Sequence, residues 1–290
     1  MISVVIPLYN KAQSFPYTLC SVLNQTYNDF EVVVVDDGST DGSADCVKQY
    51  EDSRIRLIRQ ENKGVSSARN TGIREAKGEY VCFLDADDAW APDYLSTLVA
   101  LISDYPDKGL YCLGFKERYK TDEEEMICQR NTYRGVVENP WKTNYRIWTG
   151  SVSAKRARIL KVGLFDERMN YGEDLDMWWR LILDGGLVID TSCHAFYNQD
   201  TENRAMNKTM PLERHIPYYM DKYDRIRTTN MEFRKYFDEQ MVYRIYPYLF
   251  DKQYKKEAKR LARKIDYTPL KWSLHFRMIF PHIYRWMTGR

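Results

Sequence analysis

The sequence predicts an α/β protein with a mostly parallel sheet flanked by helices, followed by a helical C-terminal region. Short apolar runs alternate with helix-like segments four times in the first 90 residues, and each run is almost continuously apolar. Continuous apolar runs of this length are typical of strands that are buried on both faces. From about residue 211 the composition changes to one rich in Tyr, Lys and Arg with little Gly, which favours helices.

The expected elements follow one another in a regular order. We expect strands at 2–6, 30–35, 55–58, 80–84 and 110–115, and helices at 15–25, 41–50, 64–77 and 153–161. Glu173 and Asp174 open a further helix, whose N-terminal end favours ionised carboxylates. The adjacent pair Trp178 and Trp179 is more typical of a core than of a sugar-binding platform.

Carboxylates gather where the expected strands end. Asp36 and Asp37 follow the second strand, and Asp85, Asp87 and Asp88 follow the fourth. Ligands of open parallel sheets bind beyond the carboxyl ends of the strands, so these groups should converge on one crevice. Crowded carboxylates repel, and the oxygen-rich set suits Mg²⁺ or Mn²⁺ shared with phosphate oxygens. The alternative is an acidic N-cap for a helix that starts near Pro92.

Several classes of protein are disfavoured. No Gly-x-Gly-x-x-Gly follows the first strand and no P-loop motif occurs, which argues against dinucleotide-dependent dehydrogenases and P-loop enzymes. Six scattered cysteines and four histidines without metal-ligand spacing argue against zinc, redox-pair and Ser-His-Asp chemistry. The net charge of +2 argues against a nucleic-acid binder. Without a signal-peptide pattern or a long apolar run, we expect a cytoplasmic protein.

Five motifs, in this order, resemble the family 2 glycosyltransferases with the GT-A fold. They are Pro7–Asn10, Val35–Asp41, Asn62–Gly72, Leu84–Asp88, and Gly163–Glu167 together with Gly172–Asp174. The resemblance covers roughly residues 1–200. It implies a GT-A catalytic domain over 1–210, with a nucleotide-binding half at about 1–105 and an acceptor half at about 106–210, before a helical region at 211–290.

The resemblance also implies roles for the matching residues. Asp36 looks like the reader of the nucleotide base, Asp85 like a ribose contact, and Asp87 like the direct ligand of Mn²⁺ or Mg²⁺. The whole set implied to bind the nucleotide-sugar is Pro7, Tyr9, Asn10, Asp36, Asp37, Arg69, Asp85, Ala86 and Asp87. Asp174 resembles the catalytic base, with Glu173 beside it.

The implied reaction moves a sugar from a nucleotide-sugar, most simply a UDP-sugar, to an acceptor hydroxyl. One base opposite the leaving group gives direct displacement with inversion. A catalytically inactive nucleotide-sugar-binding protein is the alternative. Many relatives carry a His-rich loop after the catalytic helix, which this sequence lacks; Arg204 or Lys208 could neutralise the diphosphate instead, and His194 is not assigned as a metal ligand.

The C-terminal stretch is strongly basic. Residues 251–290 contain eleven Lys and Arg against three Asp and Glu, a formal charge of +8, interleaved with Trp and Phe. Such a pattern favours a helix on anionic lipid at the inner face of the cell membrane. A saccharide or lipid-linked saccharide acceptor, in surface polysaccharide or glycolipid assembly, would suit that place. The alternative is a helical subdomain that packs on the catalytic domain with a solvated basic face.

Overall fold

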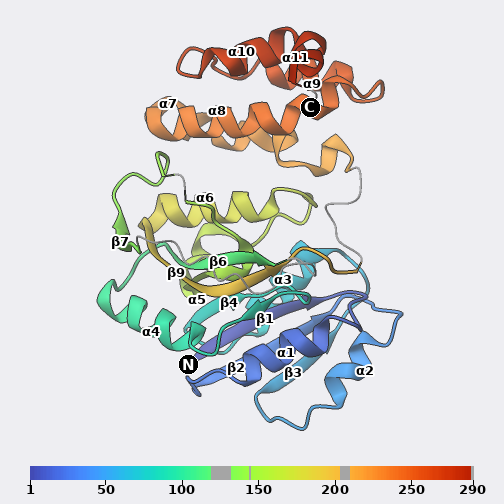
Figure 1. Cartoon of the computed structure of the whole chain (residues 1–290), viewed down its shortest axis with the longest axis vertical. Coiled ribbons are helices and arrows are strands. Elements are labelled where there is room, and N and C mark those ends of the chain that lie inside the picture. Colours follow the sequence, from blue (N-terminus) through green and yellow to red (C-terminus); the bar gives the residue numbers. More distant parts are fainter. Residues whose placement is uncertain (119–131, 144, 203–209, 289–290) are drawn as a thin grey trace. The chain divides into compact units, whose positions relative to one another are not determined.

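The computed structural model describes residues 1–118, 132–143, 145–202 and 210–288 (Figure 1). The chain forms two compact units. The first comprises residues 1–140 and 144–209, and the second comprises residues 141–143 and 210–290. The first unit is an α/β sheet and the second is helical, which confirms the fold class predicted from the sequence.

The first half of the sheet is parallel. Its strands are β1 (Ile2–Leu8), β2 (Phe30–Asp36), β3 (Ile55–Arg59) and β4 (Tyr80–Phe83), paired in the order β3-β2-β1-β4. The connecting helices are α1 (Phe15–Leu23), α2 (Ser43–Lys48) and α3 (Val65–Glu75). All of these elements lie where the alternating apolar runs predicted them, with ends that differ by a few residues.

Helices cover both faces of this parallel sheet. Successive side chains of a strand point to opposite faces, so Val4 and Ile6 of β1 share a core with Phe15 and Leu19 of α1. Val5 points to the other face, where α3 passes so closely that a Cβ on Gly72 would lie 2.3 Å from Val5 Cγ1. Glycine at this position therefore allows the helix to lie directly on the strand.

The second half of the sheet mixes strand directions. It contains β5 (Ala89–Trp90), β6 (Leu110–Arg118), β7 (Arg134–Val137), β8 (Val152–Lys155) and β9 (Leu187–Asn198), with α4 (Tyr94–Asp104), η1 (Thr149–Ser151), α5 (Arg156–Val162) and α6 (Glu173–Gly185). Within the described ranges the sheet has nine strands, in the order β3-β2-β1-β4-β8-β6-β9-β5 with β7 on β9. β8 pairs antiparallel with both β4 and β6.

The predicted start of the helix at 153–161 is wrong. Val152–Lys155 form β8, and the helix begins only at Arg156. Val152 and Ala154 are buried in the sheet. Ala and Lys favour helices on their own, but pairing with two neighbouring strands overrides that preference here.

The second unit is a small helical bundle. It contains η3 (Leu212–Arg214), η4 (Ile216–Tyr223), α7 (Asp224–Thr229), α8 (Met231–Ile245), η5 (Tyr246–Leu249), α9 (Lys255–Ala262), α10 (Trp272–Ile279) and α11 (Pro281–Thr288). Phe233 and Phe237 of α8 are fully buried at its centre, and the ring of Trp141 lies 4.7 Å from that of Phe233. In the described part of the chain, no helix combines the length and the apolar character needed to cross a bilayer.

Candidate active site

The strand order places a topological switch point between β1 and β4. From β1 the chain moves outward to β2 and β3, and it then returns to place β4 on the other side of β1. In open α/β sheets, ligands bind beyond the carboxyl ends of the strands at such a point. The last residues of β1 with the loop after it, and the loop after β4, flank this place and carry Pro7–Asn10 and Asp85–Asp88.

The carboxylates after β4 are held in different environments. Asp87 accepts a hydrogen bond from Thr201 Oγ1 at 2.6 Å, and its Oδ2 lies 2.7 Å from the ammonium nitrogen of Lys11. Asp88 is buried, and its Oδ2 has no hydrogen-bond partner among the described residues. Burial, followed by the charges of Asp87 and Asp85, raises the pKa of Asp88 well above its ordinary value. Of these two carboxylates, Asp87 therefore has a cationic partner in Lys11, whereas Asp88 is buried with one oxygen unsatisfied.

The end of β9 closes over these carboxylates. Asn198 donates its backbone N–H to Asp88 Oδ1 at 2.8 Å and its side-chain N–H to the carbonyl oxygen of Asp87 at 2.6 Å. Lys11 also donates to the carbonyl oxygen of Glu202. The sequence did not indicate these contacts, because β9 was not among the expected strands. The only available signal was the position of Lys11 directly after the Pro7–Asn10 motif.

Arg69 of α3 connects two of the predicted acidic groups. Its guanidinium donates to Asp85 at 2.8 Å and to Glu173 at 3.0 Å, and its carbon lies 5.4 Å from the centre of the Phe165 ring. The Arg69 side chain is almost completely buried. A buried arginine needs such partners, because an unpaired charge there is expensive. Arg69 therefore ties the end of β4 to the first turn of α6.

The first turn of α6 presents two neighbouring carboxylates in unequal settings. Glu173 is buried against Arg69, whereas Asp174 is partly exposed. Burial and the neighbouring charge of Asp174 raise the pKa of Glu173 to about 7, against the opposing effect of Arg69. Gly172 precedes the helix with φ +81°, a conformation that glycine adopts without strain. Asp174 is therefore the carboxylate of this pair that a ligand can reach.

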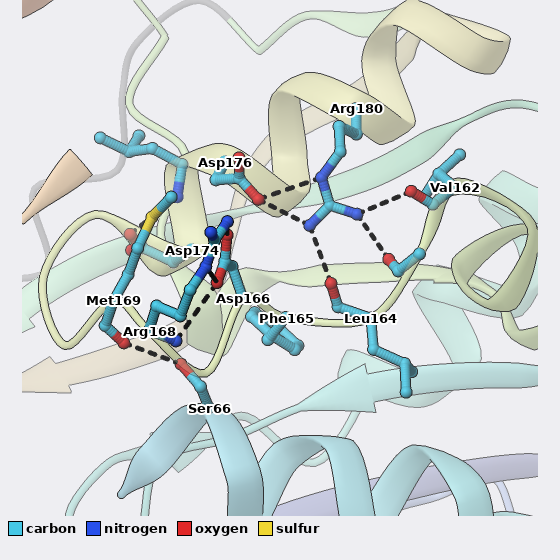
Figure 2. Close-up of polar contacts among 12 residues, drawn as sticks. Ser66, Val162, Leu164, Phe165, Asp166, Arg168, Met169, Asp174, Asp176 and Arg180 are labelled. Carbon is cyan, nitrogen blue, oxygen red and sulfur yellow. Dashed lines mark hydrogen bonds and ion pairs between the residues drawn. The ribbon is translucent and has the colours of Figure 1, made fainter. Parts of the chain in front are cut away.

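Arg180, about two turns further along α6, fastens the preceding loop to the helix (Figure 2). It pairs with Asp176 at 2.7 Å and donates to the carbonyl oxygens of Val162 and Leu164 at 2.9 and 3.0 Å. Ser66 of α3 holds the same loop through the carbonyl oxygen of Met169 at 3.2 Å. The loop that carries the motif at 163–167 is thus fastened to both α6 and α3, and its Phe165 ring lies beside Arg69.

The ends of β1 and β2 differ in how accessible their side chains are. The Tyr9 ring is 44% exposed, and Asn10 has φ +51° and accepts a hydrogen bond from Thr40 N at 2.8 Å. Asp36 has no exposed surface and pairs with Arg59 at 3.0 Å.

Asp37 and the remaining predicted contacts are also largely buried. The carboxylate of Asp37 accepts from Lys63 N at 2.9 Å and Gly64 N at 2.8 Å, so it holds the loop before α3. Pro7 is one residue from the end of β1, and Ala86 is buried between Asp85 and Asp87. The predicted nucleotide-sugar residues therefore line the ends of neighbouring strands, but several already have structural partners.

The residues after β4 fit a divalent cation that is shared with a diphosphate. In the described ranges no three His, Cys, Asp or Glu side chains form a ready-made metal cage. Mg²⁺ and Mn²⁺ do not require one, because they usually take one or two carboxylates and complete their shell with phosphate and water oxygens. Asp87 is already matched to a positive charge, the Lys11 ammonium, and Asp88 Oδ2 is a buried oxygen without a partner.

The other residues singled out in the sequence have different outcomes. His194 hydrogen-bonds Asp93 at 2.9 Å and Ser192 at 3.0 Å, so its ring nitrogens are engaged away from the carboxylates after β4. Arg204 and Lys208, proposed to neutralise the diphosphate, lie outside the described residues. Trp178 and Trp179 are buried, as their sequence context predicted.

A half-parallel sheet with carboxylates after its central strand and an acidic pair opening a helix defines the GT-A class of glycosyltransferase fold. The solved structure of residues 1–349 of TarS from S. aureus, in complex with UDP-GlcNAc, superposes with a TM-score of 0.64 at 19% identity, covering 100% of this chain and 76% of that one. At this level of identity the likeness concerns the fold.

The sequence comparisons define the family. The family model described as glycosyl transferase family 2 matches residues 3–163, and the chain belongs to this family. Validoxylamine A glucosyltransferase of Streptomyces hygroscopicus is 35% identical over 219 residues, which are 64% of this chain and 52% of that protein. Glycosyltransferase GlyA of Streptococcus pneumoniae is 45% identical over 106 residues, 36% of this chain and 15% of that protein. The enzyme class expected from the sequence is thus confirmed at the level of the family.

Proposed function

We propose that the chain transfers a sugar from a nucleoside diphosphate sugar to an acceptor hydroxyl with inversion at the anomeric carbon. The observation that carries this proposal is the buried bridge Asp85–Arg69–Glu173. It ties the strand end that would hold the donor to the helix that would supply the base. A UDP-sugar is the simplest donor, since TarS, which shares the fold, has been solved with UDP and with UDP-GlcNAc.

The donor would lie at the switch point of the sheet. The exposed ring of Tyr9 is suited to stack on the base or ribose, and Asp85 is suited to accept a ribose hydroxyl. Asp87 would hold Mn²⁺ or Mg²⁺ together with the diphosphate oxygens. Bound there, the cation would neutralise the charge that develops on the leaving diphosphate.

Asp174 is the proposed base. In the displacement, the acceptor oxygen forms a bond to C1 of the sugar while the bond from C1 to the diphosphate oxygen breaks. The electron pair leaves with the nucleoside diphosphate, and the hydroxyl proton passes to the Asp174 carboxylate. Glu173 is proposed to act on the site through Arg69, because its carboxylate is buried and already bonded to that guanidinium. Residues 1–105 would thus bind the nucleotide, and residues 106–210 would receive the acceptor.

The test is a donor panel of UDP-glucose, UDP-galactose, their N-acetyl forms and GDP-mannose, with release of nucleoside diphosphate followed with and without Mn²⁺. We expect metal-dependent release from one donor, lost in Asp87→Ala. In Asp174→Asn, donor binding should remain while release is lost. Asp107→Asn, at an exposed carboxylate remote in sequence from these motifs, is the matched control and should behave as wild type, since asparagine also tolerates the left-handed backbone of this position (φ +57°).

The alternative is a nucleotide-sugar-binding protein without transfer activity. It predicts donor binding with no release from any donor when saccharide acceptors are supplied, and equal behaviour of wild type and Asp174→Asn. Failure to bind any donor would refute both proposals. A lipid-linked saccharide of surface polysaccharide or glycolipid assembly is the acceptor class we propose.

A further inference from the structure

The last two helices of the second unit expose large apolar side chains. These are Trp272, Ile279, Phe280, Ile283 and Met287, each between 47% and 72% exposed. Single exposed apolar residues are common, but several on consecutive helices are not, and contiguous patches of this kind usually mark an interaction surface. We call these five residues the apolar stripe.

Aromatic rings gather along α10 and at its end. Trp272 and Phe276 lie about one turn apart on the helix, and Phe280 follows directly after its last residue. Their rings lie in contact, with centroids 5.2 Å apart for Trp272 and Phe276 and 5.4 Å apart for Phe276 and Phe280. Ile283 and Met287 are four residues apart, so they lie on one side of α11. The buried Leu274 lies on the remaining surface of α10, which contacts α8.

Exposed cations accompany the stripe. In the described part of the second unit, none of the following has an ion pair with an acidic side chain: Lys252, Lys255, Lys256, Lys259, Arg263 and Lys271. We call these six residues the basic set. Nearby Arg260 and Lys264 are different, because they pair with Glu257 and Asp221. The basic set therefore carries charge that the protein itself does not neutralise.

The segments that carry the basic set and the stripe are linked to one another. Tyr267 donates its hydroxyl to the carbonyl oxygen of Ala262 at the end of α9, and its own carbonyl oxygen hydrogen-bonds the ring of His275 in α10. Lys271 directly precedes Trp272. Figure 1 shows α9, α10 and α11 together on the same side of α8.

We propose that α9, α10 and α11 dock the protein on an anionic membrane surface. The stripe would enter the boundary between headgroups and acyl chains, and the basic set would contact lipid phosphates. A second copy of the chain is a poorer occupant, because joining two such surfaces would bring two unneutralised basic sets together. The inference is independent of the proposed reaction, since it depends only on residues of the second unit.

The charge contribution can be tested by sedimentation of the full chain with vesicles of neutral phosphatidylcholine, alone or with 30% phosphatidylglycerol. We expect binding to the anionic vesicles that weakens with salt. Each Lys near such a surface contributes about a fivefold gain in binding, so Lys255→Glu with Lys259→Glu should lower the partition coefficient by about 30-fold or more. Arg74→Glu with Lys77→Glu, two exposed cations of the first unit, should leave it unchanged.

The apolar contribution is tested by Ile279→Ser with Met287→Ser, which we expect to weaken binding by at least about tenfold. Met231→Ser is the matched control, because Met231 is 79% exposed outside the stripe. All of these side chains are exposed, so unchanged circular dichroism is expected and serves as the folding check. Equal binding to neutral and anionic vesicles, or wild-type binding by the stripe variant, would overturn the proposal. So would a dimer in sedimentation velocity that the stripe variant abolishes, combined with no vesicle binding.

Discussion

Replacing Arg69 by Met should destabilise the first unit strongly. The substitution keeps an apolar side chain beside Phe165 but removes the positive charge that contacts Asp85 and Glu173 at 2.8 and 3.0 Å. Asp85 is partly exposed and can be rehydrated, whereas the Glu173 carboxylate would remain buried without a counter-charge. Breaking a buried pair in this way costs about 3–5 kcal/mol of unfolding free energy.

The assay is urea unfolding at pH 8, followed by tryptophan fluorescence. Arg168→Met is the control, since Arg168 is exposed and pairs with Asp166 at 2.7 Å on the surface. Removing such a pair should cost less than about 1 kcal/mol. The loss in Arg69→Met should shrink towards pH 5, because a protonated Glu173 no longer needs the guanidinium.

A double substitution separates charge from packing. Arg69→Met with Glu173→Gln leaves no buried unpaired carboxylate, so it should recover a large part of the stability that Arg69→Met loses. If Arg69→Met is no less stable than Arg168→Met, the bridge contributes little and the reasoning is wrong. Purely additive losses in the double variant would equally contradict it.

Three further predictions follow from single contacts. Lys11→Met should let Mn²⁺ raise the melting temperature at about tenfold lower concentration, because the ammonium on Asp87 no longer competes with the cation; an unchanged Mn²⁺ titration by scanning fluorimetry would contradict this. Burial, then Arg244, lowers the pKa of His215 to about 3 from 6.5, so its stabilising contribution is complete above pH 6.5 and is lost as pH falls towards 3. Replacing His215 by Phe should flatten the unfolding free energy over this range, measured by circular dichroism. Gly72→Ala should cost about 1–3 kcal/mol by overpacking, and adding Val5→Ala should relieve part of that loss in urea unfolding.

The parallel half of the fold could be predicted because its information is local. The strands β1, β2 and β4 are nearly continuous apolar runs that end in turn residues, and carboxylates stand directly at the ends of β2 and β4. The strand β8 could not be predicted in this way. Its partners β4 and β6 lie far away in sequence, and its residues would also suit a helix.

The site residues could be predicted from the sequence, but the side chains that contact them could not. Lys11 and Asp87 are separated by 76 positions, and no periodic pattern relates them. Thr201 reaches Asp87 because it follows β9, which pairs within the sheet. Polar residues such as Ser192 interrupt the apolar pattern of β9, so the sequence did not indicate this strand. Strand ends thus indicate where a site lies, while tertiary pairing decides which charges meet there.

The segment Trp141–Thr143 has a consequence for the order in which the chain is made. Although it lies between two stretches of the first unit in the sequence, its Trp141 packs against Phe233 and Tyr236 of the second. At typical rates of synthesis, Trp141 leaves the ribosome about 5–20 s before these partners. A chain ended near residue 209 would leave this indole permanently without them, so shortened versions of the protein should be prone to aggregate even when their sheet is complete.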